Sequence, residues 1–345
     1  MICDETEIRI ENRTYSSIDI TKFFFCLCII ALHTHLLSFL PTFQDYCIEK
    51  NLFRLAVPFF FISSGYFLAS KWYKYDGGFH VIKRYCKRLM LPLTAFSLVY
   101  ISQYAIYSFF FNGKDIVHIS LRLARNVLFY PMGALWFVQA CIVGSLLLYP
   151  FLKRNKLSLA ITCGIILYGV GQLFNSYSFI MGEWGEQEII LSYCISLRNG
   201  FTMGLLWLAL GFKCYQINKE QPSRSVLTAV LVFGIILQLI ETGMIFYVTS
   251  NNLADDGSLF ISQLIVVPAL LLLLLQTKIE INEDISIRLR NLSTGMYFLH
   301  APLRFMYEFF IHNDILLFIV VFMSSYMICV FSYKTLFLHF DRLLK

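Results

Sequence analysis

The chain has 345 residues, of which 58% are hydrophobic and only 14% are charged. Soluble globular domains contain about 25% charged residues, so this composition excludes an ordinary soluble domain and indicates a protein embedded in lipid. The net charge of +6 does not indicate nucleic-acid binding, because the basic residues lie between apolar runs, where membrane topology places them. We expect membrane lipid as a partner and no nucleic acid.

The apolar runs predict an all-α integral membrane protein, because about 20 apolar residues are needed for each crossing. Runs bounded by charge predict about ten transmembrane helices in a single bundle, at residues 18–40, 52–70, 89–111, 131–151, 157–175, 192–212, 225–249, 259–276, 292–311 and 315–338. The corresponding organisation is a cytoplasmic N-terminal segment at 1–17, one transmembrane domain at 18–338 and a cytoplasmic tail at 339–345.

The distribution of basic residues predicts the orientation. With the N-terminus on the cytoplasmic side, most of the 28 Lys and Arg residues fall in cytoplasmic connections, and the outer connections hold only Lys50, Lys114, Arg122 and Arg125. Positive residues accumulate on the inner side of membrane proteins. Both termini are therefore expected inside, in a cytoplasmic membrane that we expect to be bacterial.

The ten cysteines are mostly single residues within apolar runs, and no C-x-x-C pair occurs. A disulfide framework or a zinc site needs paired spacings. We expect neither, and no metal cofactor.

Ionisable residues at membrane depth normally mark functional sites, because a charge in hydrocarbon is costly. In the first predicted helix, Lys22 and His33 are eleven positions apart, which places them about 20° apart around the axis and about 16 Å apart along it. His35 lies about 200° around the helix from His33 and cannot share its site. We therefore predict that His33 faces the site and that His35 is structural.

Further buried charges are expected in the outer half of the membrane, where one polar cavity opening outward would satisfy them all: Arg54, Arg198, Glu241, His300, Arg304 and Glu308. We predict acceptor-side or supporting roles for the first five. Two alternatives stay open. Arg304 and Glu308 have the spacing of a simple i, i+4 ion pair, and Arg54 is near enough to the interface to snorkel.

A basic cluster precedes the third predicted helix, with Lys83, Arg84, Lys87 and Arg88 close together. Such clusters hold loops inside and attract anionic headgroups. The same side chains at this spacing suit the phosphates of a nucleotide-like cofactor such as coenzyme A. Composition alone favours the topological interpretation.

Three stretches resemble the acyltransferase family 3 of integral membrane proteins, over most of the chain. The first is I-D-I-T-K-F-F-F-C-L-C-I-I-A-L-H at 18–33, with Lys22 where the family commonly has arginine. The second is R-L-A-V-P-F-F-F-I-S-S-G-Y-F-L at 54–68, followed by K-R-Y-C-K-R-L-M-L-P at 83–92. The third comprises A-L-W-F-V at 134–138 and G-M-Y-F-L-H-A-P-L at 295–303.

The resemblance implies an O-acetyltransferase-like enzyme that takes an acyl group, commonly acetyl, from cytoplasmic acyl-CoA and delivers it to a hydroxyl of a cell-surface or lipid-linked carbohydrate. His33 would then act as general base or as acyl carrier. Lys22, Arg84, Lys87 and Arg88 would bind the donor. Some relatives carry an additional extracytoplasmic domain, which is not apparent here, so a separate extracytoplasmic partner is one expectation.

Two unlike functions remain as alternatives. A multi-pass transporter would use the same buried charges along its pathway, and a glycan flippase or polymerase would use them with large outer loops. The sequence has no evident symmetry between two halves, and its outer connections are short.

Overall fold

The computed structural model describes residues 15–110, 133–181, 198–249 and 259–335, and within these ranges the chain is helical and contains no β-strand. The helices of its first half are α2 (Ser16–His33), α3 (Thr42–Asn51), α4 (Ala56–Lys74), α5 (Phe79–Phe110), α7 (Leu135–Lys153) and α8 (Leu157–Leu173). Those of its second half are α11 (Leu205–Lys219), α12 (Arg224–Val248), α13 (Gln263–Gln276), α14 (Glu283–Tyr307) and α15 (Asp314–Thr335). Short 3-10 turns lie at η1 (Phe53–Leu55) and η2 (Ser178–Met181), and a π-helical turn lies at η3 (Gly200–Gly204).

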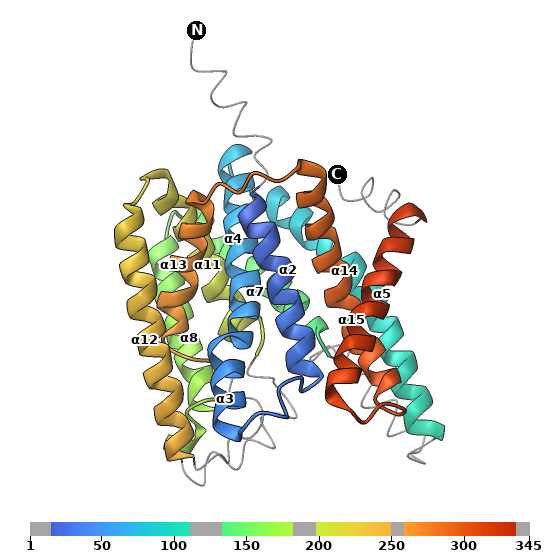
Figure 1. The fold of residues 1–345 in the computed structure, drawn as a ribbon. Coiled ribbons are helices and arrows are strands. Elements are labelled where there is room, and N and C mark those ends of the chain that lie inside the picture. Colours follow the sequence, from blue (N-terminus) through green and yellow to red (C-terminus); the bar gives the residue numbers. More distant parts are fainter. Residues whose placement is uncertain (1–14, 111–132, 182–197, 250–258, 336–345) are drawn as a thin grey trace.

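Helices α2 and α4 lie in the middle of the bundle, with α12 and α13 on one side and α14, α15 and α5 on the other (Figure 1). Helix α2 packs along α14, α4 along α11, and α12 along α13. The buried core is continuous across these contacts and is made of aliphatic and aromatic side chains. The middle position of α2 sets its polar residues among neighbouring helices rather than in lipid.

Glycine permits a close backbone-to-backbone approach between α4 and α11. A Cβ on Gly211 would lie 2.6 Å from the backbone nitrogen of Tyr66, and a Cβ on Gly65 would overlap the backbone of Leu208. Small residues let membrane helices approach backbone to backbone, which replaces the hydrophobic drive that lipid cannot supply. This contact anchors α4, whose first turn carries part of the site.

Several helices are long and apolar enough to cross a membrane, over Ser16–His33, Thr42–Lys74, Phe79–Phe109, Leu135–Lys153, Arg224–Val248 and Asp314–Ser332. Helices suit lipid because they satisfy their own backbone hydrogen bonds. Each of the predicted apolar runs overlaps one or more helices of the described part of the chain. The number of crossings and their orientation remain predictions.

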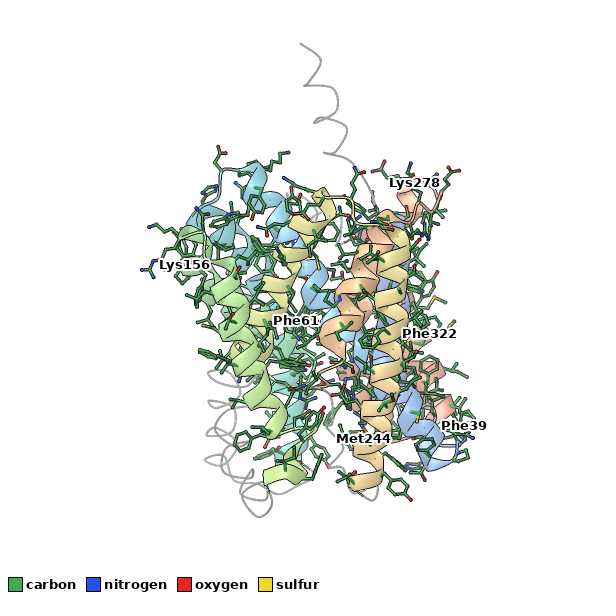
Figure 2. The ribbon with its side chains drawn as sticks, turned by 90° about the vertical axis from the view of Figure 1, so that its left-hand side faces the viewer. Phe39, Phe61, Lys156, Met244, Lys278 and Phe322 are labelled. Carbon is green, nitrogen blue, oxygen red and sulfur yellow. The ribbon has the colours of Figure 1, made fainter. Side chains whose placement is uncertain are left out.

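The ends of the bundle are chemically different. The start of α2 and the end of α15 lie at the same end of the molecule (Figure 1). Lys156 and Lys278 lie toward this end, and Phe39 and Met244 lie toward the opposite one (Figure 2). We call the first the inner end, following the predicted orientation, and the second the outer end. The predicted segments 1–17 and 339–345 fall almost wholly outside the described residues, as do Lys114, Arg122 and Arg125.

The predicted boundaries were wrong in three places. The first helix stops at His33 rather than continuing to residue 40, because the Thr34 hydroxyl caps the carbonyl of Ile30 at 2.9 Å and His35 turns the chain with φ of 51°. Residues 42–51, expected in a connection, form α3. Helix α5 starts at Phe79, ten residues before the predicted start, so the basic cluster is helical.

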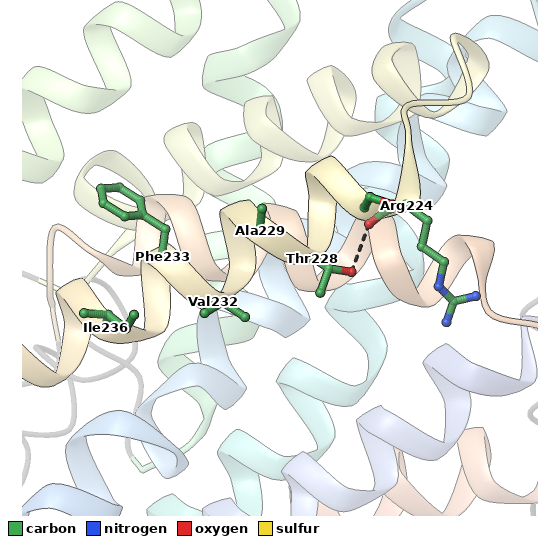
Figure 3. Close-up of a pocket in the computed structure, with 7 residues that line it drawn as sticks. Arg224, Thr228, Ala229, Val232, Phe233 and Ile236 are labelled. Atoms are coloured by element: carbon green, nitrogen blue, oxygen red, sulfur yellow. Dashed lines mark hydrogen bonds between the residues drawn. The ribbon is translucent and has the colours of Figure 1, made fainter.

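One face of α12 points away from the bundle and forms an open, shallow surface lined by Arg224, Ser225, Thr228, Ala229, Val232, Phe233 and Ile236 (Figure 3). Thr228 satisfies its hydroxyl within the helix by donating to the carbonyl oxygen of Arg224 at 2.9 Å. Beyond Arg224 and Ser225 at the start of the helix, the remaining lining residues are apolar and exposed, which suits contact with lipid. This surface carries no acid, histidine or cysteine, and we do not consider it as a reaction site.

Candidate active site

His33 is the last residue of α2, at its outer end. Its ring stacks on that of His300 from α14, with centroids 5.3 Å apart and planes inclined by 25°. The pair exists because α2 and α14 pack side by side. The structure thus brings together two of the histidines that the sequence analysis selected, from positions 267 residues apart.

His300 is fully buried and has a defined partner on one edge of its ring. Its Nδ1 lies 2.6 Å from the carbonyl oxygen of Tyr297, a geometry in which Nδ1 carries the proton and donates it. Nε2 then presents a lone pair, and no described residue donates to it. The arrangement fixes both the tautomer and the plane of the ring against which His33 packs.

Tyr297 connects this pair to α7. Its hydroxyl donates to the carbonyl oxygen of Ala134 at 2.6 Å. Ala134 follows Gly133, which has φ of +56° and lies so near Tyr100 that a Cβ would come within 2.5 Å of the ring. A residue with a side chain would strain this turn. The local sequence therefore places the start of α7 against α14, beside the two histidines.

Arg54 enters the same region from η1. Its guanidinium donates to Glu49 Oε1 at 3.1 Å, and Lys50 donates to the same oxygen at 2.8 Å. Glu49 and Lys50 lie on α3, the helix that the sequence analysis did not predict. A buried cation needs such a partner, so α3 supplies the acid that holds Arg54 in place.

Arg198 lies just before the π-helical turn Gly200–Gly204. Its guanidinium carbon is 5.7 Å from the centroid of the Trp136 ring, within the range of a cation–π contact. The following residue, Asn199, accepts hydrogen bonds from the backbone of Phe201 and Thr202 at 2.8 and 3.1 Å, which starts the π-helical turn Gly200–Gly204. Such turns are frequent at functional sites, and this one fixes the backbone that carries Arg198.

A small cavity of about 50 Å³ joins these groups. Its polar walls are formed by His33, Arg54, Arg198, Trp136 and Tyr297. The remaining lining is apolar: Ile29, Leu32, Phe53, Val57, Pro58, Ala134 and Met203. Because one water molecule takes about 30 Å³, the cavity has room for little more than a small group in this structure.

Three arginines act electrostatically on the His33 ring, namely Arg54, Arg198 and Arg304. Arg304 also forms an ion pair with Glu308 at 3.2 Å, on the partly exposed face of α14, as the i, i+4 spacing suggested. Two of these arginines, Arg54 and Arg198, line the cavity, and their positive charge favours negative charge within it. The arrangement suits a reaction in which an oxygen atom becomes anionic.

Glu241 does not join this group. It accepts hydrogen bonds from the backbone N–H groups of Ile261 and Ser262 at 2.6 and 2.8 Å and from the Tyr177 hydroxyl. These N–H groups lie at the start of α13, where an acid is favourable. The described contacts of Glu241 are therefore structural, and it does not line the cavity.

The inner end of α2 holds a separate polar cluster. Lys22 lies over the Phe67 ring, 5.1 Å from its centroid, and interacts electrostatically with Asp19, Arg290 and Arg88. Asp19 is buried and accepts two hydrogen bonds from Arg290, at 2.9 and 2.7 Å, and one from Ser286 at 2.7 Å. Lys22 and His33 thus belong to opposite ends of one central helix.

The basic cluster at the start of α5 is exposed: Lys83, Arg84, Lys87 and Arg88 all face out of the packed interior. Arg84 and Arg88 are close enough to Lys71 of α4 to repel it electrostatically. The structure therefore gathers cations from α2, α4, α5 and α14 around the inner end of the bundle.

Comparisons with known proteins agree with this arrangement. A family profile described as an acyltransferase domain matches residues 15–334. The chain belongs to acyltransferase family 3. Together with its apolar helices, membership of this family indicates a multi-pass membrane protein and supports membrane acyltransferase activity.

The curated relatives of this chain are named as racemases rather than as acyltransferases. An amino-acid racemase of Enterococcus faecalis is 25% identical over 299 residues, which is 83% of this chain and 40% of the relative. A serine/alanine racemase of Enterococcus gallinarum is 26% identical over 223 residues, or 61% of this chain and 30% of the relative. The chain thus spans less than half the length of these proteins. No solved structure matches it.

The sequence analysis missed four residues of this acyltransferase-family site: Asp19, Glu49, Trp136 and Tyr297. Asp19 was visible as an acid one helical turn before Lys22, and Trp136 and Tyr297 lay within the quoted motifs. Glu49 could not be predicted as a site residue, because it lies in a polar stretch between two apolar runs and was interpreted as part of a connection. Within the described ranges no group of three His, Cys, Asp or Glu is placed to hold a metal ion.

Proposed function

We propose that the chain transfers an acyl group, specifically acetyl, from cytoplasmic acyl-CoA to a hydroxyl of a cell-surface or lipid-linked carbohydrate. The observation that carries the proposal is the cavity in which His33 meets Arg54 and Arg198, at the outer end of α2. Family membership supports the acyl transfer itself. Donor, acceptor and sidedness are parts of the proposal.

His33 acts as the general base in the proposed reaction. Its imidazole takes the proton of the acceptor hydroxyl while the hydroxyl oxygen attacks the thioester carbonyl. The carbonyl oxygen becomes an oxyanion, and Arg54 and Arg198 stabilise its charge. The C–S bond then breaks, the imidazolium returns the proton to the departing thiolate, and the products are an acyl ester and free coenzyme A.

The supporting residues have distinct tasks in this proposal. His300 positions the His33 ring by stacking, Glu49 positions Arg54, and Trp136 positions Arg198. Arg304 adds positive charge near the ring. The contacts of Glu241 support a structural task at the start of α13.

The donor would bind at the inner end, with its phosphates near Lys22, Arg84, Lys87 and Arg88. Lys22 and His33 are about 16 Å apart along α2, a span that an extended pantetheine arm bridges. The thioester then reaches the outer cavity while the nucleotide stays at the cytoplasmic face.

The proposal is tested with membranes that contain this protein and membranes that lack it, supplied with acetyl-CoA labelled in the acetyl group. Label should enter membrane carbohydrate only where the protein is present, and mild alkali should release it, as expected for an O-ester. Label confined to free acetate or to lipid in both samples contradicts a carbohydrate acceptor.

A second candidate function is transport of a small solute, and the names of the relatives, which refer to amino acids, suggest the solute to test. The cations of the cavity would suit the carboxylate of an amino acid during transport. Uptake of labelled serine or alanine by liposomes containing the purified protein, without any acyl donor, would favour this function over acyl transfer.

A further inference from the structure

The ion pair between Asp19 and Arg290 joins the two helices that also carry the histidine pair. Arg290 Nε donates to Asp19 Oδ1 at 2.9 Å and Nη2 donates to Oδ2 at 2.7 Å, so the contact is bidentate. Ser286, one turn earlier on α14, donates to Oδ2 at 2.7 Å. Such a planar pair fixes the direction of the guanidinium.

One edge of the Arg290 guanidinium remains available. No described residue accepts a hydrogen bond from Nη1, and the side chain is 47% exposed while that of Asp19 is only 4% exposed. Asp19 thus binds the Nε and Nη2 side of the guanidinium from within the protein, and the Nη1 side remains for a contact from outside. An arginine that were only a structural partner for Asp19 would not need this exposure.

The surroundings of Arg290 are positively charged. Lys22 lies near both Arg290 and Arg88, and Asp19 is the acid that acts on Lys22. Glu283, in the first turn of α14, is a further acid that acts on Arg290. Lys22, Arg88 and Arg290 outnumber the acids Asp19 and Glu283, so the cluster keeps a net positive charge that favours an anion.

We infer that Arg290 is a donor-binding residue that contacts a phosphate of the coenzyme A moiety, and that Asp19 and Ser286 position it for this contact. Arginine suits phosphate because it offers charge and paired N–H donors. The inference rests on the proposed acyl-CoA donor. The phosphate of an anionic lipid headgroup has the same chemistry, and the experiment separates the two sources.

The test is binding of coenzyme A and of pantetheine, which lacks phosphate, to the purified full-length protein in detergent. Arg290→Gln should weaken coenzyme A binding about tenfold or more, the scale of one charge-assisted hydrogen bond, and should leave pantetheine binding unchanged. Asp19→Asn should weaken coenzyme A binding by less, again with no effect on pantetheine. Unchanged pantetheine binding also shows that each variant is folded.

Arg288→Gln is the matched control, because Arg288 is exposed on the same helix and carries the same charge. It should bind coenzyme A as the parent protein does. If the Arg288 and Arg290 substitutions weaken coenzyme A binding equally, the loss of one positive charge explains the effect and the inference is overturned. Equal losses for coenzyme A and pantetheine would also overturn it, because they indicate structural damage.

Two further outcomes are informative. If Arg290→Gln binds coenzyme A normally but loses binding to phosphatidylglycerol in mixed micelles, the residue contacts lipid headgroups and the inference is wrong. If the parent protein binds no coenzyme A at all, the proposed donor is wrong. The second result concerns the proposed function and is distinguishable from a failure at Arg290.

Discussion

The imidazole rings of His33 and His300 are stacked at a centroid distance of 5.3 Å, although the two residues lie on different helices. His300 is held from behind by the carbonyl oxygen of Tyr297, at 2.6 Å from Nδ1. His33 lines the cavity and His300 does not. The pair therefore divides into a ring that faces the cavity and a ring that packs against it.

Replacing His300 with alanine should lower kcat about tenfold to a hundredfold and leave the KM for the acyl donor nearly unchanged, because misplacing a catalytic ring affects the chemical step. His300→Phe should retain part of the activity, since a flat ring still packs on His33. Steady-state kinetics on the purified variants measures both constants. A rise in KM with an unchanged kcat would assign His300 to donor binding instead.

Replacing Glu49 with glutamine should destabilise the fold by about 1–3 kcal/mol, since it leaves the buried cations Arg54 and Lys50 without their shared acid. Activity should fall too, because Arg54 lines the cavity. Thermal unfolding in detergent reports the stability. The control is Glu308→Gln, which removes a more exposed ion pair with Arg304 and should cost less than about 1 kcal/mol. Equal shifts for both variants would contradict the assigned task of Glu49.

Replacing Gly211 with alanine should separate α11 from α4, because the new Cβ would lie 2.6 Å from the nitrogen of Tyr66. We expect a loss of about 1–3 kcal/mol from overpacking and a lower yield of folded protein. Gly169→Ala is the matched substitution, since nothing lies within 4 Å of the Cβ position at Gly169. Comparable thermal stability of the two variants would show that the α4–α11 contact accommodates the added methyl group without a loss of stability.

The approximate positions of the helices could be predicted from the sequence, because apolar runs of spanning length have few alternatives in lipid. The end of α2 at His33 could not, since residues 34–40 remain apolar and the turn depends on local bonding of Thr34 and the positive φ of His35. Helix α3 was missed for the opposite reason, because its residues are polar on average. Its Glu49 then became visible only through its contact with Arg54.

The placement of Lys22 and His33 along α2 could be predicted because one helix carries both residues, whereas their roles stay predictions. The contacts between helices could not be predicted, because helical periodicity does not tell which face of α14 meets α2. The sequence analysis therefore grouped Glu241 with the buried arginines, whereas its observed partners are the backbone of Ile261 and Ser262. It also left out Asp19, whose partner Arg290 is distant in the sequence.

The central claim is that His33 performs the proposed acyl transfer, and one comparison tests it most directly. Labelled acetyl-CoA is supplied to membranes holding equal amounts of the parent protein, His33→Ala or His35→Asn, and transfer of label to carbohydrate is followed over time. We predict that His33→Ala loses about a hundredfold or more of the rate. His35→Asn, altered at an exposed residue outside the cavity to a side chain that tolerates the positive φ of this turn, should transfer label as the parent does. Equal rates for His33→Ala and the parent protein would contradict the assignment.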